Sequence, residues 1–202
     1  MYVRTGSVVE NQKQVEKKFP HMTKEYFIEG LLELWTTQDI LCFELNEEKF
    51  GTDVAVNMYC ELWERRCTPE FYHLKTEIGL EKDDPVTMDQ FMDMIEIYYN
   101  GLGNPLVVTH REPDYYEASC YDCPYTTQFA WKLYDKKRVD HFMDSTQVDC
   151  NKTLFETFLK LAGLYDDWLF TFGSAICRYG GKCNFQFRKK IKEPEWPKLA
   201  EE

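Results

Sequence analysis

Hydrophobic positions in the first part of the chain recur at the spacing of amphipathic helices. The pattern predicts a helix over residues 23–45, a second from residue 54 that ends near Pro69, and a third over residues 71–78. The stripe of the first helix consists of Tyr26, Phe27, Leu31, Leu34, Trp35 and Leu41.

Further helices are predicted from capping signals and from periodicity. The sequence Thr87-x-x-Gln90 has the form of a capping box and predicts a helix that runs to Gly101. Two shorter helices are expected over residues 125–134 and 152–161.

The pattern changes after residue 103, where β-branched and aromatic residues alternate with polar ones. In the last segment Cys183, Phe185 and Phe187 alternate with polar residues, as in a strand with one buried face. Helices followed by strands indicate an α+β fold, with N-terminal helices packed on a C-terminal antiparallel sheet and further helices interspersed. The predicted strands cover residues 105–111, 114–121, 166–177 and 183–191.

The length of the chain fits one domain. Its 202 residues are expected to form a single domain over 1–202, with a helical part at about 23–100, a sheet-containing part at about 104–191 and flexible ends. The hydrophobic fraction of 44% supplies a core, which excludes a disordered chain.

Charge and hydropathy exclude several classes of partner. The formal net charge of −11 argues against a nucleic-acid binder or a protein of anionic membrane surfaces. No run approaches the roughly 20 apolar residues of a membrane span, and no secretory signal is seen at the N-terminus. We therefore expect a cytoplasmic protein, whose eight cysteines are thiols.

The segment from Cys120 to Pro124 holds the densest group of reactive side chains. A cysteine directly before a helix is exposed to the positive end of the helix dipole, which favours a thiolate at Cys123. Such a thiolate can attack a carbon atom or bind a metal. Two semi-buried cysteines at a strand-to-helix turn would explain the same pattern equally well. A four-cysteine zinc site is a further alternative, with Cys120, Cys123, Cys177 and Cys183 as candidate ligands.

Two other residues are candidates for proton transfer or charge binding. His141 lies in a polar stretch and can act as a base, although a surface role explains it as well. Asp149 precedes the helix expected at 152–161, so it is either an N-terminal cap or a general base. Cys42, Cys60 and Cys67 lie in or beside apolar stripes and are expected to be protected.

No nucleotide cofactor is expected, because the chain has no glycine-rich dinucleotide motif and no phosphate-binding loop. Zinc is the one cofactor that the cysteines suggest.

Three short motifs resemble the L-2-amino-thiazoline-4-carboxylic acid hydrolase family. They are Cys123-Pro124-Tyr125, Val148-Asp149, and a Gly-rich turn followed by Cys183-Asn184-Phe185-x-Phe187. The resemblance extends from about residue 25 to 190, with Asn184 where the family usually has Asp.

The resemblance implies hydrolysis of a carbon–nitrogen bond in a small cyclic amidine or thiazoline, with Cys123, Asp149 and Cys183 at the site. These three residues are then expected within about 10 Å of one another at one pocket. The same C-terminal hairpin also resembles the small-molecule-binding domains related to 4-vinyl reductase, which are not enzymes. Both alternatives imply a small-molecule substrate or ligand. The oligomeric state stays open, a homo-oligomer included.

Overall fold

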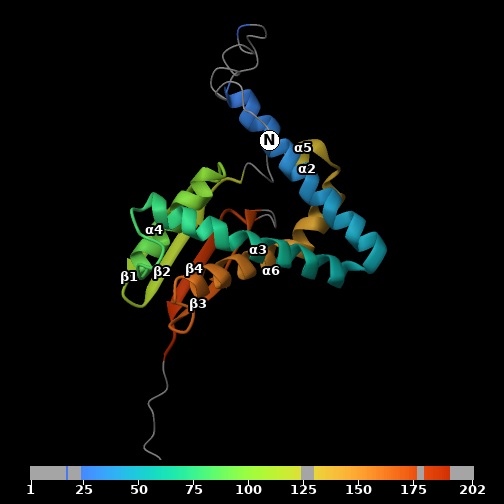
Figure 1. Cartoon of the computed structure of the whole chain (residues 1–202). Coiled ribbons are helices and arrows are strands. Elements are labelled where there is room, and N and C mark those ends of the chain that lie inside the picture. Colours follow the sequence, from blue (N-terminus) through green and yellow to red (C-terminus); the bar gives the residue numbers. More distant parts are fainter. Residues whose placement is uncertain (1–16, 18–23, 124–129, 177–179, 192–202) are drawn as a thin grey trace, which may run out of the picture.

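The computed structural model describes residues 17, 24–123, 130–176 and 180–191 and has the expected α+β architecture (Figure 1). Long helices precede a four-stranded sheet, and one long helix lies between its second and third strands. The elements are α2 (Lys24–Phe50), α3 (Thr52–Glu77), α4 (Met88–Gly101), β1 (Leu106–Glu112), β2 (Tyr115–Cys120), α5 (Trp131–Leu133), α6 (Lys136–Leu161), β3 (Trp168–Phe172) and β4 (Cys183–Lys189).

The sheet is antiparallel throughout, as predicted, with the strand order β1-β2-β4-β3. Ala118 on β2 is opposite Phe185 on β4, and Phe187 is opposite Phe170 on β3. All four of these side chains are buried in one core cluster, which identifies the face of the sheet that packs on the helices. Helix α4 contacts β1 and β2, while α6 contacts β3.

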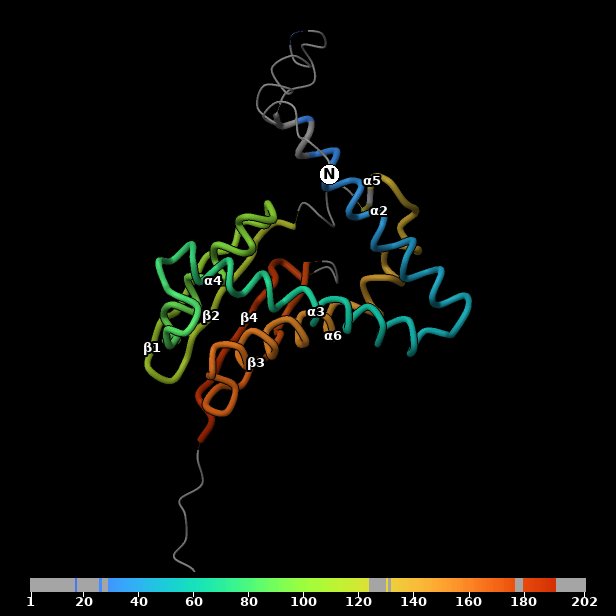
Figure 2. The backbone as a smooth tube through the Cα atoms, in the orientation of Figure 1, coloured from blue at the N-terminus to red at the C-terminus, as the bar shows by residue number. Residues whose placement is uncertain are grey.

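Helices α3 and α6 lie side by side and extend from the sheet to α2 (Figures 1 and 2). Helices α2 and α3 form a hairpin joined at Gly51, whose φ of 85° is in the region that favours glycine. The amide of Gly51 donates a hydrogen bond to the carbonyl oxygen of Glu47 at 2.8 Å, which closes the end of α2.

The buried hydrophobic residues form two clusters along α3 and α6. The larger one fills the space between the sheet and the helices, with Phe71, Phe155 and Phe158 at its centre. The smaller one joins α2 to the N-terminal halves of α3 and α6. Trp63 and Cys183 pack against both clusters, so the two cores meet at these side chains.

The predicted helix break at Pro69 is wrong, because α3 is continuous from Thr52 to Glu77 with Pro69 inside it. Proline in a helix interior costs about 3 kcal/mol through a lost hydrogen bond and a clash. Cys67, Phe71 and Leu74 continue one buried face across this position, and their burial outweighs that cost.

The helix predicted over 152–161 is only the C-terminal part of α6, which begins at Lys136. Asp135 caps it by accepting a hydrogen bond from the amide of Lys137 at 3.0 Å. The sequence predicts a short helix over residues 125–134. Residues 125–129 lie outside the described residues, and the described remainder of this range contains α5. The strand predicted over 166–177 ends at Phe172.

Helix α2 is present as predicted, but several residues of its apolar stripe do not face the core. Ile40 and Phe43 are buried, whereas Leu31 and Leu34 are 67% and 63% exposed. The reason is that α2 packs along α3 and α6 through the Ile40 side of the helix. None of the described helices is long and apolar enough to cross a membrane.

The capping box of α4 forms as predicted and provides a test of local stability. Thr87 Oγ1 accepts a hydrogen bond from the amide of Gln90 at 3.3 Å, and Gln90 Oε1 accepts one from the amide of Thr87 at 2.9 Å. Thr87→Ala should lower the free energy of unfolding by about 1 kcal/mol in a urea titration. Thr76→Ala, in the exposed last part of α3, is the control and should change it by less than about 0.5 kcal/mol. Equal effects of the two substitutions would contradict a stabilising role of the cap.

Candidate functional site

The main candidate site is a cavity of about 90 Å³ where α2, α3, α4 and α6 meet one end of the sheet. It is partly open to solvent. This is smaller than the closed cavity of about 150 Å³ that holds benzene, so a single small ring would fill it and reach into the opening. A larger ligand would have to extend through the opening.

The walls of the cavity are aromatic and uncharged. Asn104, Gln147 and Asn151 supply amide groups, and none of the described lining residues carries a charged side chain. Such walls favour a neutral ligand, because burying an unpaired charge is costly. The aromatic lining residues include Trp35, Trp63, Tyr98, Tyr99, Phe172 and Phe185.

An arginine outside the lining holds two of these walls in place. The guanidinium carbon of Arg66 lies 5.0 Å from the ring centroid of Trp35 and 4.9 Å from that of Trp63. Arg66 also donates hydrogen bonds to Glu70 Oε1 at 2.6 and 3.0 Å. The indole rings from α2 and α3 are therefore tied to one cation, which orders this side of the cavity.

Two residues that line the cavity each have a buried side-chain oxygen without a hydrogen-bond partner among the described residues. These atoms are Tyr98 Oη and Asn104 Oδ1. Burial is the main cause of the raised pKa of Tyr98, and the nearby Glu70 carboxylate adds to it. Glu70 acts on this hydroxyl through its charge and through a weak hydrogen-bonding contact, but Glu70 Oε2 and Tyr98 Oη both remain without a partner at full hydrogen-bond geometry. An unpaired buried polar group costs about 1–3 kcal/mol, so a ligand that pairs with these atoms gains affinity.

Two of the cysteines predicted to converge at one site do so. Cys123 and Cys183 both line the cavity, together with Cys120 and Cys150. Burial raises the pKa of Cys120 to about 12 and that of Cys183 to about 11, so both are neutral thiols near pH 7. Cys123 is half-buried, and the predicted helix start at residue 124 lies outside the described residues.

The prediction that Asp149 joins Cys123 and Cys183 is wrong. Asp149 lies within α6, is exposed, and lines a separate polar hollow next to Thr52 and Asp53. Successive helical residues point in directions about 100° apart, so the helix that directs Cys150 into the cavity turns Asp149 away from it. Asp149 also does not cap a helix, because it lies in the interior of α6, whose N-cap is Asp135.

His141 is likewise outside the cavity lining and belongs to the surface of α6. Its side chain is 54% exposed, and Nε2 lies 2.8 Å from Glu47 Oε1 on α2. Its ring also makes an edge contact with Phe43, at a centroid distance of 6.0 Å. These contacts give His141 a role in holding α6 on α2.

The three candidate zinc ligands that the structure describes do not form a metal cage. Cys120, Cys123 and Cys183 line the same cavity, and Cys177 lies outside the described residues. In the part of the chain that the structure describes, no group of three or more His, Cys, Asp or Glu side chains is arranged to hold a metal ion. Cys120 Sγ donates to the carbonyl oxygen of Asp122 at 2.7 Å, a contact that suits a neutral thiol.

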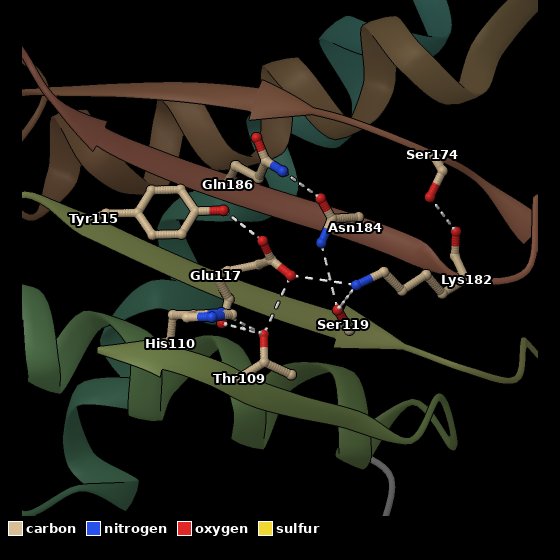
Figure 3. Close-up of polar contacts among 9 residues, drawn as sticks. All are labelled: Thr109, His110, Tyr115, Glu117, Ser119, Ser174, Lys182, Asn184 and Gln186. Carbon is tan, nitrogen blue, oxygen red and sulfur yellow. Dashed lines mark hydrogen bonds and ion pairs between the residues drawn. The ribbon is translucent and has the colours of Figure 1, made fainter. Parts of the chain in front are cut away.

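A polar cluster separate from the cavity lies on the face of the sheet opposite the core (Figure 3). The Glu117 carboxylate accepts hydrogen bonds from the Tyr115 hydroxyl and from Lys182 Nζ, the latter at 3.2 Å. Lys182 Nζ also donates to Ser119 Oγ at 3.0 Å, and Asn184 Nδ2 lies 3.4 Å from the same oxygen.

This cluster joins β2 to β4 and is better suited to structure than to catalysis. Ser119 is 0% exposed, so its hydroxyl is not accessible to a substrate. Burial alone would raise the pKa of Glu117, but hydrogen bonds from Tyr115, Asn184 and Lys182 lower it to about 2. The carboxylate is therefore ionised and fully paired at neutral pH.

Sequence reasoning missed Tyr98, Asn104 and Cys150 as site residues. Tyr98 belongs to the apolar stripe of α4, where it is expected to be an ordinary core residue. Cys150 could have been found from the spacing of Val139, Phe142 and its neighbours along α6, which identifies the buried face of that helix. Asn104 gives no local signal, since only the meeting of distant elements brings it to the cavity.

The paired Glu117 makes stability depend on pH in a defined direction. A carboxyl whose pKa falls from 4.5 to about 2 on folding stabilises the protein above pH 4.5, and this contribution is lost between about pH 4.5 and 2. Glu117→Gln should lower the free energy of unfolding at pH 7 by about 1–3 kcal/mol and flatten its decline in this pH range. The exposed Glu112→Gln on β1 is the control in chemical denaturation at pH 7 and pH 3. An unchanged pH profile in Glu117→Gln would show that the cluster does not stabilise the fold.

Comparison of the chain with protein-family models, with curated proteins and with solved structures found no significant match. The resemblance to the thiazoline hydrolase family therefore stays a prediction, and a function has to be argued from the cavity itself.

Proposed function

We propose that the chain binds a small, neutral, ring-containing molecule in the aromatic cavity between the helices and the sheet. The observation that carries this proposal is the pair of buried, unpartnered oxygen atoms, Tyr98 Oη and Asn104 Oδ1, in two residues that line a mostly aromatic and uncharged cavity. A hydroxyl can donate and an amide oxygen can accept, so the pair matches a ligand with one acceptor and one donor.

Aromatic rings from both layers of the fold support this ligand class. Trp35 and Trp63 come from the helical hairpin, and Phe185 comes from β4. A planar ring placed among them gains stacking and edge contacts in addition to burial of its apolar surface. The cytoplasmic location expected from the sequence is part of this proposal.

The distribution of charge favours binding over hydrolysis. Hydrolysis at a thiol needs a thiolate and a group that transfers protons. Cys120 and Cys183 are neutral thiols near pH 7, which leaves Cys123 as the candidate nucleophile, and both His141 and Asp149 lie outside the described lining. The binding-module alternative therefore fits the cavity better than the enzyme.

Removing the Tyr98 hydroxyl tests the proposed site. A panel of neutral five- and six-membered heterocycles, each with one donor and one acceptor, is titrated while tryptophan fluorescence is recorded, since Trp35 and Trp63 line the cavity. Tyr98→Phe should weaken binding of any hit about 3- to 10-fold, the loss of one hydrogen bond.

The matched control is Tyr72→Phe, which removes a hydroxyl from α3 outside the lining residues and should leave the affinity unchanged. Saturable binding that is equal in wild type and Tyr98→Phe would place the ligand elsewhere. A panel without any saturable binding would contradict the proposal itself.

A second candidate function is thiol-dependent hydrolysis at Cys123, as the family resemblance implies. One observation favours it: Cys123 lines the cavity beside Cys120 and Cys183 and is only half-buried. Its thiolate would add to the ring carbon of a bound cyclic amidine or thiazoline, and water would then release the product.

For this second candidate, Cys123→Ser should abolish hydrolysis of thiazoline or amidine substrates while ligand binding persists, because serine nearly preserves volume but is a far weaker nucleophile. The control is Cys42→Ser, at an exposed site on α2, which should keep full activity. Product formation is followed by liquid chromatography. Turnover that survives Cys123→Ser would rule out this residue as the nucleophile.

A further inference from the structure

A pair of cysteines links α3 to α6 beside the cavity. Cys60 on α3 and Cys150 on α6 have their sulfur atoms 3.6 Å apart. Cys60 is half-buried and reachable, whereas Cys150 is 3% exposed and lines the cavity. Neither residue belongs to a motif of the family that the sequence resembles, and neither is needed for the ligand-binding proposal.

We propose that Cys60 and Cys150 are a dithiol oxidation site, which forms a reversible intramolecular disulfide when a hydroperoxide reacts with Cys60. The sulfur atoms need to approach only from 3.6 Å to about 2.0 Å to form the bond. Adjustment of the two side-chain rotamers on neighbouring helices can supply such a movement.

The environments of the two thiols assign them different roles. Cys60 is the more exposed of the two thiols, and its contact with Cys150 is the main cause that lowers its pKa to about 7, against the effect of burial. The same contact and burial raise the pKa of Cys150. Cys60 is thus the thiolate that attacks the oxidant, and Cys150 is the thiol that resolves the intermediate. Of the three cysteines expected to be protected, Cys67 is buried, Cys60 is half-buried, and Cys42 is exposed, so the expectation is wrong for Cys42.

The reaction balances with one hydroperoxide for each disulfide. The Cys60 thiolate attacks the peroxide O–O bond and forms a sulfenic acid, and the departing alkoxide or hydroxide takes up a proton to give an alcohol or water. Cys150 Sγ then attacks the Cys60 sulfur, the S–S bond forms, and the hydroxyl leaves as water with the Cys150 proton. A dithiol reductant reverses the change through thiol–disulfide exchange.

The bond would cross-link α3 to α6 at the level of the cavity. Because Cys150 lines the cavity, its movement toward Cys60 changes the cavity wall. An effect of oxidation on ligand affinity rests on the proposed binding function, whereas formation of the disulfide does not.

Peptide mapping of the full chain tests the disulfide. The reduced protein is treated with equimolar hydrogen peroxide, the remaining thiols are blocked with N-ethylmaleimide, and the digest is analysed by mass spectrometry. We expect one cross-linked pair containing Cys60 and Cys150, lighter by two hydrogens and lost after dithiothreitol. In Cys150→Ser the cross-link should be absent, and Cys60 should be trapped as a sulfenic acid by dimedone.

Cys67→Ser is the matched control, since Cys67 also lies on α3 and faces α6, with Sγ 3.9 Å from the carbonyl oxygen of Leu154. It should retain the cross-link. The inference is overturned if the folded wild-type protein gives no Cys60–Cys150 peptide, or if Cys60 pairs with other cysteines instead. The peptide map of the wild-type protein decides whether the disulfide forms, so a variant that fails to fold does not affect the conclusion. The result is also independent of whether the protein binds a ligand.

Discussion

The packing of α3 against α6 is the contact on which the other features of this structure depend. Both helices run from α2 to the sheet, and each contributes to both core clusters. Phe71 on α3 lies against Phe158 on α6, and Cys60 lies against Cys150 further along. If the two helices separated, the sheet would lose its cover, α2 would lose its support, and the cavity would lose two of its walls.

The same arrangement separates apolar from charged groups on the two faces of the sheet. On the core face, Phe155 contacts Phe170, Phe185 and Phe187 with ring centroids 4.5 to 5.5 Å apart. On the other face, Glu117 and Lys182 pair with each other. The charge that stabilises strand pairing is therefore kept out of the cavity, whose described lining is neutral. This separation is the physical reason for favouring a neutral ligand.

Features governed by local chemistry could be predicted from the sequence, and features governed by tertiary burial could not. The capping box at Thr87 is local, and its prediction is confirmed. Phe185 and Phe187 on β4 are buried as predicted, but Asn184 on the opposite face is buried too. Pro69 is a strong local signal for a helix end, but burial of the residues around it overrides that signal. Placing Cys183 beside Cys123 was correct, whereas Asp149 is one helical position away from the residue that lines the cavity. Tyr98 and Asn104 became candidates only when the packing identified which buried polar atoms have no partner.

The most direct test of the central claim is to locate bound ligand by NMR of the tryptophan indole groups. Ring-¹⁵N labelling gives each indole N–H its own signal, and single Trp→Phe variants assign the signals. Addition of a neutral heterocycle with one donor and one acceptor should shift the signals of Trp35 and Trp63, which line the cavity. The signal of Trp168, buried in the sheet core against Tyr116, should stay in place. Unchanged Trp35 and Trp63 signals at ligand concentrations that saturate binding would contradict the account.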